Sequence, residues 1–93
     1  MYTFYMNIEL LQNKDFAAAG NAFYQSIKKA ISNNDTLSVD MEGVTSLPSI
    51  FLNASLGRII DEEGKDRLKQ SVGFVKITKQ QALRLRDYLQ RYN

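Results

Sequence analysis

Two stretches in which apolar and polar residues alternate, and a third short apolar stretch at residues 72–77, are each followed by a stretch with helical spacing of its apolar residues. Alternation with a period of two indicates a strand with one covered face, and spacing of three and four indicates an amphipathic helix. The predicted strands cover residues 2–11, 36–42 and 72–77, and the predicted helices cover 15–32, 49–62 and about 79–91. This βαβαβα order predicts an α/β fold with a small, mainly parallel sheet and helices packed mostly on one face.

The chain of 93 residues is long enough for one hydrophobic core and too short for two, so we expect a single domain over residues 1–93. No apolar run approaches the length that spans a bilayer, and residues 1–7 lack the basic start and long apolar core of a signal peptide. The absence of cysteine is typical of a reducing compartment. These features predict a cytoplasmic protein without membrane association.

Histidine and cysteine are both absent, which removes the usual general base near neutral pH, the usual zinc ligands and the thiolate nucleophile. Carboxylates remain. Asp40 and Glu42 lie at the carboxyl end of the second predicted strand, where α/β sheets usually place their sites. They form a paired acid/base or a cation site, or else they are solvated on an uncovered sheet face or bind turn amides. No third ligand is identifiable, so we expect no metal, no cofactor and no catalytic residue.

The first and last predicted helices carry local start signals. Asn13 or Asp15 is expected to cap the first helix, and Thr78 followed by Gln81 is typical of a capping box at the start of the last one. Gly20 lies on the apolar stripe of the first helix, together with Phe16. Glycine costs ~1 kcal/mol against alanine within a helix, so we expect Gly20 to pack closely against the sheet.

The middle helix is bounded by proline and glycine. Pro48 suits a position near a helix start, with Ser46 or Ser49 as the capping residue, and Gly64 is expected to end the helix. Residues 65–70 are expected to add one short helical turn before the third strand.

A candidate docking surface follows from this boundary between the second strand and the middle helix. The strand end, the turn and the helix start are expected to lie at one rim of the sheet. The residues that we expect to contact a protein partner there are Asp40, Glu42, Thr45, Ser46, Leu47, Ser49, Ile50 and Asn53. Ser49 is either a phosphate acceptor at a helix N-terminus or an ordinary cap worth ~1 kcal/mol.

Residues 37–64 also carry a resemblance to a known family. The matching elements are Val39-Asp40, Gly43-Val44, Ser49, Phe51-Leu52-Asn53 and Gly57, together with the later Val72-Gly73-Phe74-Val75 strand. Over about residues 15–92 the chain resembles the STAS-like domains of bacteria, which are relatives of the anti-sigma factor antagonists. The resemblance implies a regulatory interaction domain with a kinase-like ATPase or an anti-sigma type protein as its partner, and phosphorylation of Ser49 as an off-switch. Pro48 stands where the antagonists have an acidic residue.

The positive charge of the chain is concentrated at its C-terminal end. Residues 1–63 carry a net charge of −4 and residues 64–93 a net charge of +6. Cations on and near the last helix could meet nucleic-acid phosphates, and two tyrosines could add stacking; these residues are Lys76, Lys79, Arg84, Arg86, Arg91, Tyr88 and Tyr92. The alternative is an amphipathic packing helix, which Leu83, Leu85 and Leu89 favour. No nucleic-acid-binding motif is present, so nucleic-acid association is the second hypothesis.

Aromatic residues gather at the N-terminus, on a predicted edge strand. Tyr2, Phe4 and Tyr5 are either core residues or part of an edge that extends the sheet across a homodimer.

Overall fold

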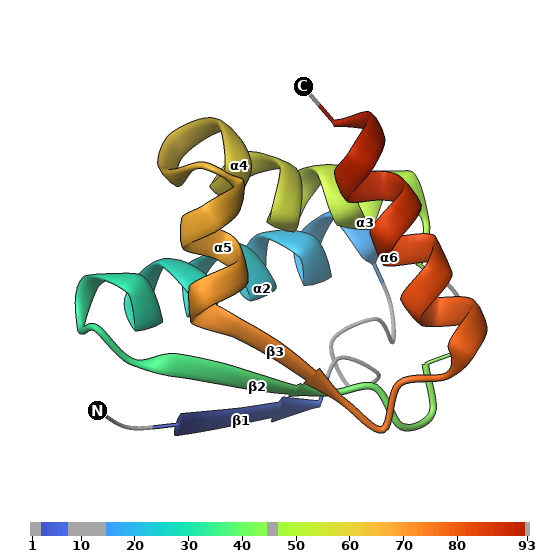
Figure 1. The fold of residues 1–93 in the computed structure, drawn as a ribbon, viewed down its shortest axis with the longest axis horizontal. Helices are drawn as coiled ribbons and strands as arrows, with labels where there is room; N and C mark the ends of the chain where they lie inside the picture. The colour runs from blue at the N-terminus through green and yellow to red at the C-terminus, as the bar shows by residue number, and fades with distance from the viewer. Residues whose placement is uncertain (1–2, 8–14, 45–46, 93) are drawn as a thin grey trace.

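The computed structural model describes residues 3–7, 15–44 and 47–92 of the chain. Its elements are β1 (Thr3–Asn7), α2 (Phe16–Ser32), β2 (Thr36–Asp40), α3 (Ser49–Leu52), η1 (Asn53–Gly57), α4 (Arg58–Glu63), α5 (Lys65–Ser71), β3 (Val72–Val75) and α6 (Lys79–Arg91) (Figure 1). The elements α3, η1 and α4 follow one another without a break, because the π-helical turn η1 keeps right-handed helical geometry at both ends.

The described strands form one parallel sheet in the order β1-β2-β3. Leu37 of β2 is in register with Phe4 of β1 and with Val72 of β3. The predicted α/β class and parallel sheet agree with this topology. β1 lies at one edge of the sheet, as the hypothesis of an extended sheet requires; the homodimer itself stays a prediction, and Tyr2 lies outside the described residues.

The helices α2 to α6 lie on the same side of the sheet (Figure 1). Burial along β2 alternates accordingly, since Leu37 and Val39 are buried while Ser38 and Asp40 are partly exposed. The alternation of apolar and polar residues along β2 thus corresponds to a sheet with one covered face, as predicted.

An additional helix modifies the predicted βαβαβα order. Gly64 ends α4, as predicted, with a φ of 91° that favours glycine, and it lets the chain begin a new helix at once. Residues 65–70 are helical, as expected, but α5 extends over seven residues and is longer than the single turn that was predicted. α5 persists because Leu68 is buried in the core and because Arg67 donates a hydrogen bond to the carbonyl oxygen of Ile31.

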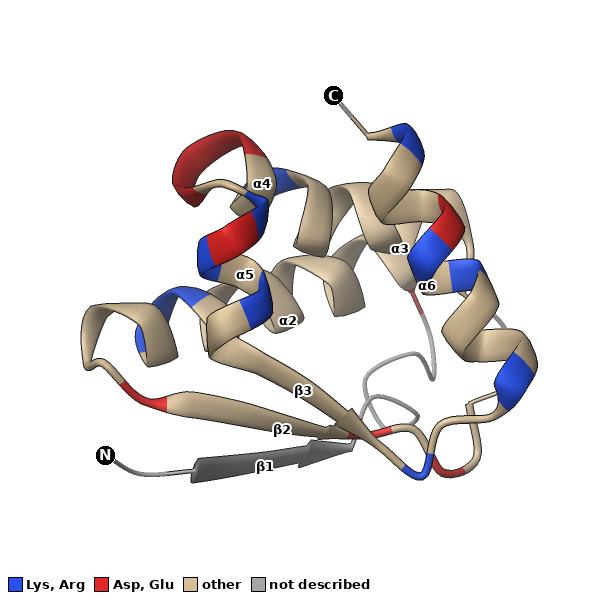
Figure 2. Ribbon diagram, viewed as in Figure 1, with Lys and Arg blue, Asp and Glu red and all other residues tan. Residues whose placement is uncertain are grey.

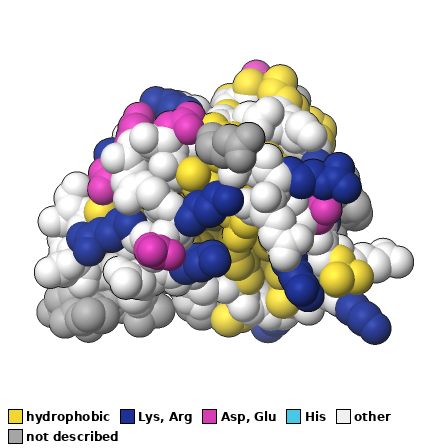
Figure 3. All heavy atoms as spheres, turned by 45° about the horizontal axis from the view of Figure 1, so that its top comes forward, with side chains coloured by type: hydrophobic (Ala, Val, Ile, Leu, Met, Phe, Trp, Pro, Cys, Tyr) yellow, Lys and Arg dark blue, Asp and Glu magenta, His cyan; other side chains and the backbone are white. Residues whose placement is uncertain are grey.

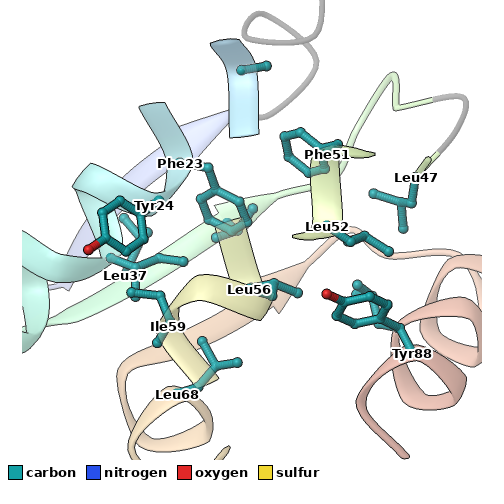
Figure 4. Packing of buried hydrophobic residues seen from close by; sticks show 14 of the residues in the cluster. Phe23, Tyr24, Leu37, Leu47, Phe51, Leu52, Leu56, Ile59, Leu68 and Tyr88 are labelled. Carbon is teal, nitrogen blue, oxygen red and sulfur yellow. The ribbon is translucent and has the colours of Figure 1, made fainter. Parts of the chain in front are cut away.

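The core lies between the sheet and the helices (Figure 4). Phe23 of α2 and Phe51 of α3 stack at its centre, with ring centroids 5.8 Å apart and planes 9° apart. Phe51, Leu52 and Ile59 are fully buried. Full burial of such side chains stabilises a fold by ~1.5–3 kcal/mol each, so the helix that begins at Ser49 is anchored along its length.

Gly20 marks the closest approach of two helices. A Cβ at Gly20 would lie 2.6 Å from Ala54 Cβ and 2.8 Å from the carbonyl oxygen of Phe51. The expectation of close packing is correct in kind, but the partner is α3 and η1 rather than the sheet. The helices meet here because α2 and the helix from Ser49 run alongside each other on the same side of the sheet (Figure 1).

The capping residues predicted from the sequence are confirmed for two of the three helices with such a prediction. Asp15 caps α2, accepting hydrogen bonds from the amides of Ala17 and Ala18. Thr78 and Gln81 form the predicted capping box of α6. The helix that begins at α3 has Pro48 at its cap position, so of the two predicted caps Ser49 is wrong, and Ser46 lies outside the described residues.

Candidate functional site

Ser49 is the first residue of α3, and its side chain is exposed. Its hydroxyl makes no capping hydrogen bond; instead Oγ accepts a hydrogen bond from Nη2 of Arg84 on α6, at 3.2 Å. Pro48, at the cap position, has the extended conformation that is usual there, with φ −68° and ψ 152°, and its side chain has no group that could cap the helix. Ser49 is therefore available as a hydroxyl group beside a guanidinium group.

α6 is attached to this region through main-chain acceptors. Arg84 also donates from Nε to the carbonyl oxygen of Leu47, at 3.1 Å, and Gln81 donates from Nε2 to the carbonyl oxygen of Val44, at 2.8 Å. The guanidinium group thus holds the loop before α3 and Ser49 at the same time. This contact joins two segments that are far apart in the sequence, and single-sequence patterns gave no signal for it.

Two of the predicted partner-binding residues are engaged within the domain. Leu47 is buried, with 7% of its surface exposed. Asn53 accepts a hydrogen bond of 2.7 Å from the hydroxyl group of Tyr88. Ile50, in contrast, has 56% of its surface exposed and follows Ser49 directly. Thr45 and Ser46 lie outside the described residues.

Asp40 and Glu42 form a turn that is closed by a cation. Oδ1 of Asp40 accepts a hydrogen bond from the amide of Glu42, at 2.9 Å, as the hypothesis of turn-amide binding requires. Lys76 lies 3.0 Å from the carboxylate of Glu42 and 3.9 Å from that of Asp40. Within the described part of the chain, no three acidic, histidine or cysteine side chains are arranged to hold a metal ion. These contacts tie the turn after β2 to Lys76 at the rim of the sheet, and a paired acid/base at Asp40 and Glu42 stays a hypothesis.

A second exposed apolar side chain lies near the level of Ile50. α2 and the helix from Ser49 run side by side in the same direction, with Gly20 beside Ala54 and Tyr24 beside Arg58. This offset places Phe16, the first residue of α2, at the same end of the helix pair as Ile50. Phe16 was expected on the core stripe, but 37% of its surface is exposed because it precedes the first buried turn of α2.

Acidic residues gather at the end of α4, whereas α5 and α6 carry mostly basic residues together with Asp66 and Asp87 (Figure 2). The acidic end is neutralised locally, since Lys28 of α2 pairs with Glu62 at 3.0 Å and with Glu63 at 2.7 Å. The hydroxyl group of Tyr24 donates to Glu62, and this hydrogen bond, helped by Lys28, lowers the pKa of the Glu62 carboxyl. These acids hold α2 to α4.

The stacking residues proposed for nucleic acid have structural partners. Tyr88 is buried, and burial raises its pKa to about 12. Tyr92 donates to Asp61 at 2.8 Å. Arg91 pairs with Asp87, and Arg84 holds Leu47 and Ser49 as described above. This geometry favours the packing role of α6 over the nucleic-acid role.

Comparison with known protein families identifies the family of this chain. A family described as a STAS-like domain of unknown function (DUF4325) matches residues 19–82, about two thirds of the chain. The chain therefore belongs to this family of STAS-like domains, and the resemblance noted from the sequence is confirmed. Searches of curated proteins and of solved structures gave no match. Among the helices of the described ranges, none combines the length and apolar character needed to cross a bilayer.

Proposed function

We propose that this domain is a non-enzymatic regulatory module that binds a protein partner through the end of the helix pair at Ser49 and Ile50. The observation that carries the proposal is the exposed hydroxyl group of Ser49, held 3.2 Å from the guanidinium group of Arg84, directly before the exposed side chain of Ile50. An exposed apolar residue beside a modifiable hydroxyl group suits a switchable contact. Phe16 extends the same end of the domain with apolar surface.

Phosphorylation of Ser49 would act on this surface in two ways. A phosphate adds about two negative charges at neutral pH and three strong acceptor oxygens. Arginine binds phosphate through two parallel hydrogen bonds, so Arg84 is placed to take the group without a rearrangement of α6. The added charge next to Ile50 would oppose burial of that side chain against a partner. The switch would therefore release the partner while tightening the contact between α3 and α6.

Membership of the STAS-like family supports a kinase-like ATPase or an anti-sigma type protein as the partner, as the resemblance implies. The proposed setting is the cytoplasm, for a protein of bacteria or of their phages. Asp40 and Glu42 are not assigned to the main partner contact, because Lys76 and a turn amide already bind them. The partner contact itself is assigned to Ser49 and Ile50.

A pull-down from lysate of the organism that carries the gene tests the proposal, with and without nuclease. Wild type is compared with Ile50→Asp and Ser49→Glu, and Leu83→Asp is the matched control, because Leu83 is 52% exposed and lies elsewhere, on α6. We expect a protein that survives nuclease, is lost with Ile50→Asp, is reduced with Ser49→Glu and is retained with Leu83→Asp. Recovery of nuclease-sensitive material alone would instead support the nucleic-acid hypothesis, and equal loss with Leu83→Asp would reject the assigned surface.

A further inference from the structure

An apolar groove of about 550 Å³ opens between α5, β3 and α6. Its apolar lining includes Leu68 of α5, Val72 and Phe74 of β3, Ile77, and Leu85 and Leu89 of α6. The groove lies away from Ser49 around α6, because Arg86 lines it while Arg84 contacts Ser49, and side chains two positions apart on a helix do not face the same way. It is therefore separate from the surface proposed above.

The groove exists because α6 covers the edge of the sheet incompletely. β3 is an edge strand, and Val72 and Phe74 are only partly buried against the core. α6 directs Tyr88 toward Asn53 of η1, whereas Leu85 of the same helix lines the groove beside β3. The apolar groove residues that are only partly buried lose dispersion contacts on their open side unless a ligand covers them; they are Val72, Phe74, Ile77 and Leu89.

Cations stand on both walls of the groove. Lys65 and Lys69 come from α5, one helical turn apart, and Arg86 comes from α6 on the opposite wall. Within the described part of the chain, these three side chains form no ion pair, and no acidic residue lines the groove. Figure 3 shows the resulting strip of apolar surface flanked by basic side chains. Charge complementarity therefore favours an occupant with an anionic group and an apolar body.

The volume of the groove favours a small molecule over a helical peptide as its occupant. A helix about 10 Å wide would fill 550 Å³ with little more than one turn, which is too short to form an independent helical anchor. Small-molecule sites are commonly hollows of roughly 300–1,000 Å³ with mostly apolar walls and a few polar groups. The groove has this size and this lining.

We propose that the groove binds a small amphipathic anion, with its apolar body against Leu68, Phe74 and Leu89 and its carboxylate or phosphate headgroup between Lys69 and Arg86. Burial of the apolar body supplies most of the binding free energy, and the cations on the two walls set the preference for negative charge. Occupancy would also join α5 to α6, which line opposite walls of the groove.

Titration of ¹⁵N-labelled protein followed by amide NMR tests this proposal, with decanoate, decyl phosphate and decyltrimethylammonium as probes below their micelle concentrations. We expect saturable shifts that map to residues 65–74 and 82–90 for the two anions, and binding at least about tenfold weaker for the cation. The tighter of the two anions identifies the preferred headgroup.

A pair of charge-matched variants separates a site from general charge attraction. Lys69→Gln with Arg86→Gln removes one cation from each wall, whereas Lys29→Gln with Lys79→Gln removes two positive charges outside the groove. We expect the first pair to weaken decanoate binding about tenfold, and the second pair to leave it within about twofold of wild type. The proposal is overturned if the cationic probe binds equally well, if the shifts map outside the groove, or if both pairs behave alike.

Discussion

Ser49 and Arg84 are 35 residues apart in the chain, yet a single hydrogen bond joins the first residue of α3 to the middle of α6. The same guanidinium group holds the carbonyl oxygen of Leu47, so it fixes the loop before the helix as well as the helix start. A modification of the Ser49 hydroxyl group would therefore change its contact with Arg84 of α6 directly. A regulatory role for Ser49 can therefore be tested by substitution of Ser49 and of Arg84 separately.

Phosphoserine placed at position 49 should titrate at a lower pH than a free phosphoserine. The guanidinium group of Arg84 favours the doubly charged phosphate, so its second pKa is expected below the ordinary value of about 6. Phosphorus NMR of the domain with phosphoserine at this position measures the pKa. In Arg84→Gln the value is expected to return toward that of a free phosphoserine, and an unchanged value in that variant would show that Arg84 does not receive the phosphate.

Replacement of Gly20 by alanine should destabilise the domain. The added Cβ would overlap Ala54 Cβ and the main-chain oxygen of Phe51, and neither can move without displacing a helix. Overpacking of this kind costs roughly 1–3 kcal/mol in the free energy of unfolding, measured by urea denaturation. Gly73→Ala is the control, because a Cβ there meets no atom within 4 Å, and we expect a change within about 0.5 kcal/mol. Equal effects of the two substitutions would contradict the close approach of α2 and α3.

Tyr88→Phe tests the attachment of α6. Loss of the hydrogen bond to Asn53 is expected to lower the free energy of unfolding by ~1 kcal/mol at pH 7. Burial raises the pKa of Tyr88 to about 12, whereas in the unfolded chain it lies near 10. The stability that Tyr88 contributes is thus fully present below pH ~10 and is lost as the pH rises toward 12. Urea unfolding at pH 7 and pH 11 should show the difference between wild type and variant shrinking.

Glu62→Gln tests the link between α2 and α4. The hydroxyl group of Tyr24 and the ammonium group of Lys28 lower the pKa of Glu62 in the folded state. The carboxylate therefore contributes stability that is present above its unfolded pKa of about 4.3, and that is lost as the pH falls through the lower folded pKa. Wild type should unfold at higher urea concentration than the variant at pH 7, and the two midpoints should converge near pH 3. A constant gap across this range would show that the ionised carboxylate is not what stabilises the contact.

The features of this protein that depend only on residues close together in the sequence could be predicted from the sequence. Asp15 and the pair Thr78 and Gln81 cap their helices through hydrogen bonds to amides two or three residues away, and Gly64 ends α4 by its own backbone conformation. The alternation along β2 predicted a sheet with one covered face for the same reason, since it depends on the period of the strand alone. The family resemblance rested on such local elements, and the match over residues 19–82 agrees with it.

The candidate sites were decided by tertiary structure. Arg84 reaches Ser49, Tyr88 reaches Asn53 and Lys76 closes the turn at Glu42, in each case across more than 30 residues. The groove between α5 and α6 likewise depends on how far α6 stands from the edge strand β3. Periodicity tells which face of an element is apolar, but the pairing of side chains is fixed only when packing sets the distances between elements. The sequence alone therefore determined the elements and their buried faces, while the tertiary structure decided which polar groups meet and where apolar surface stays open.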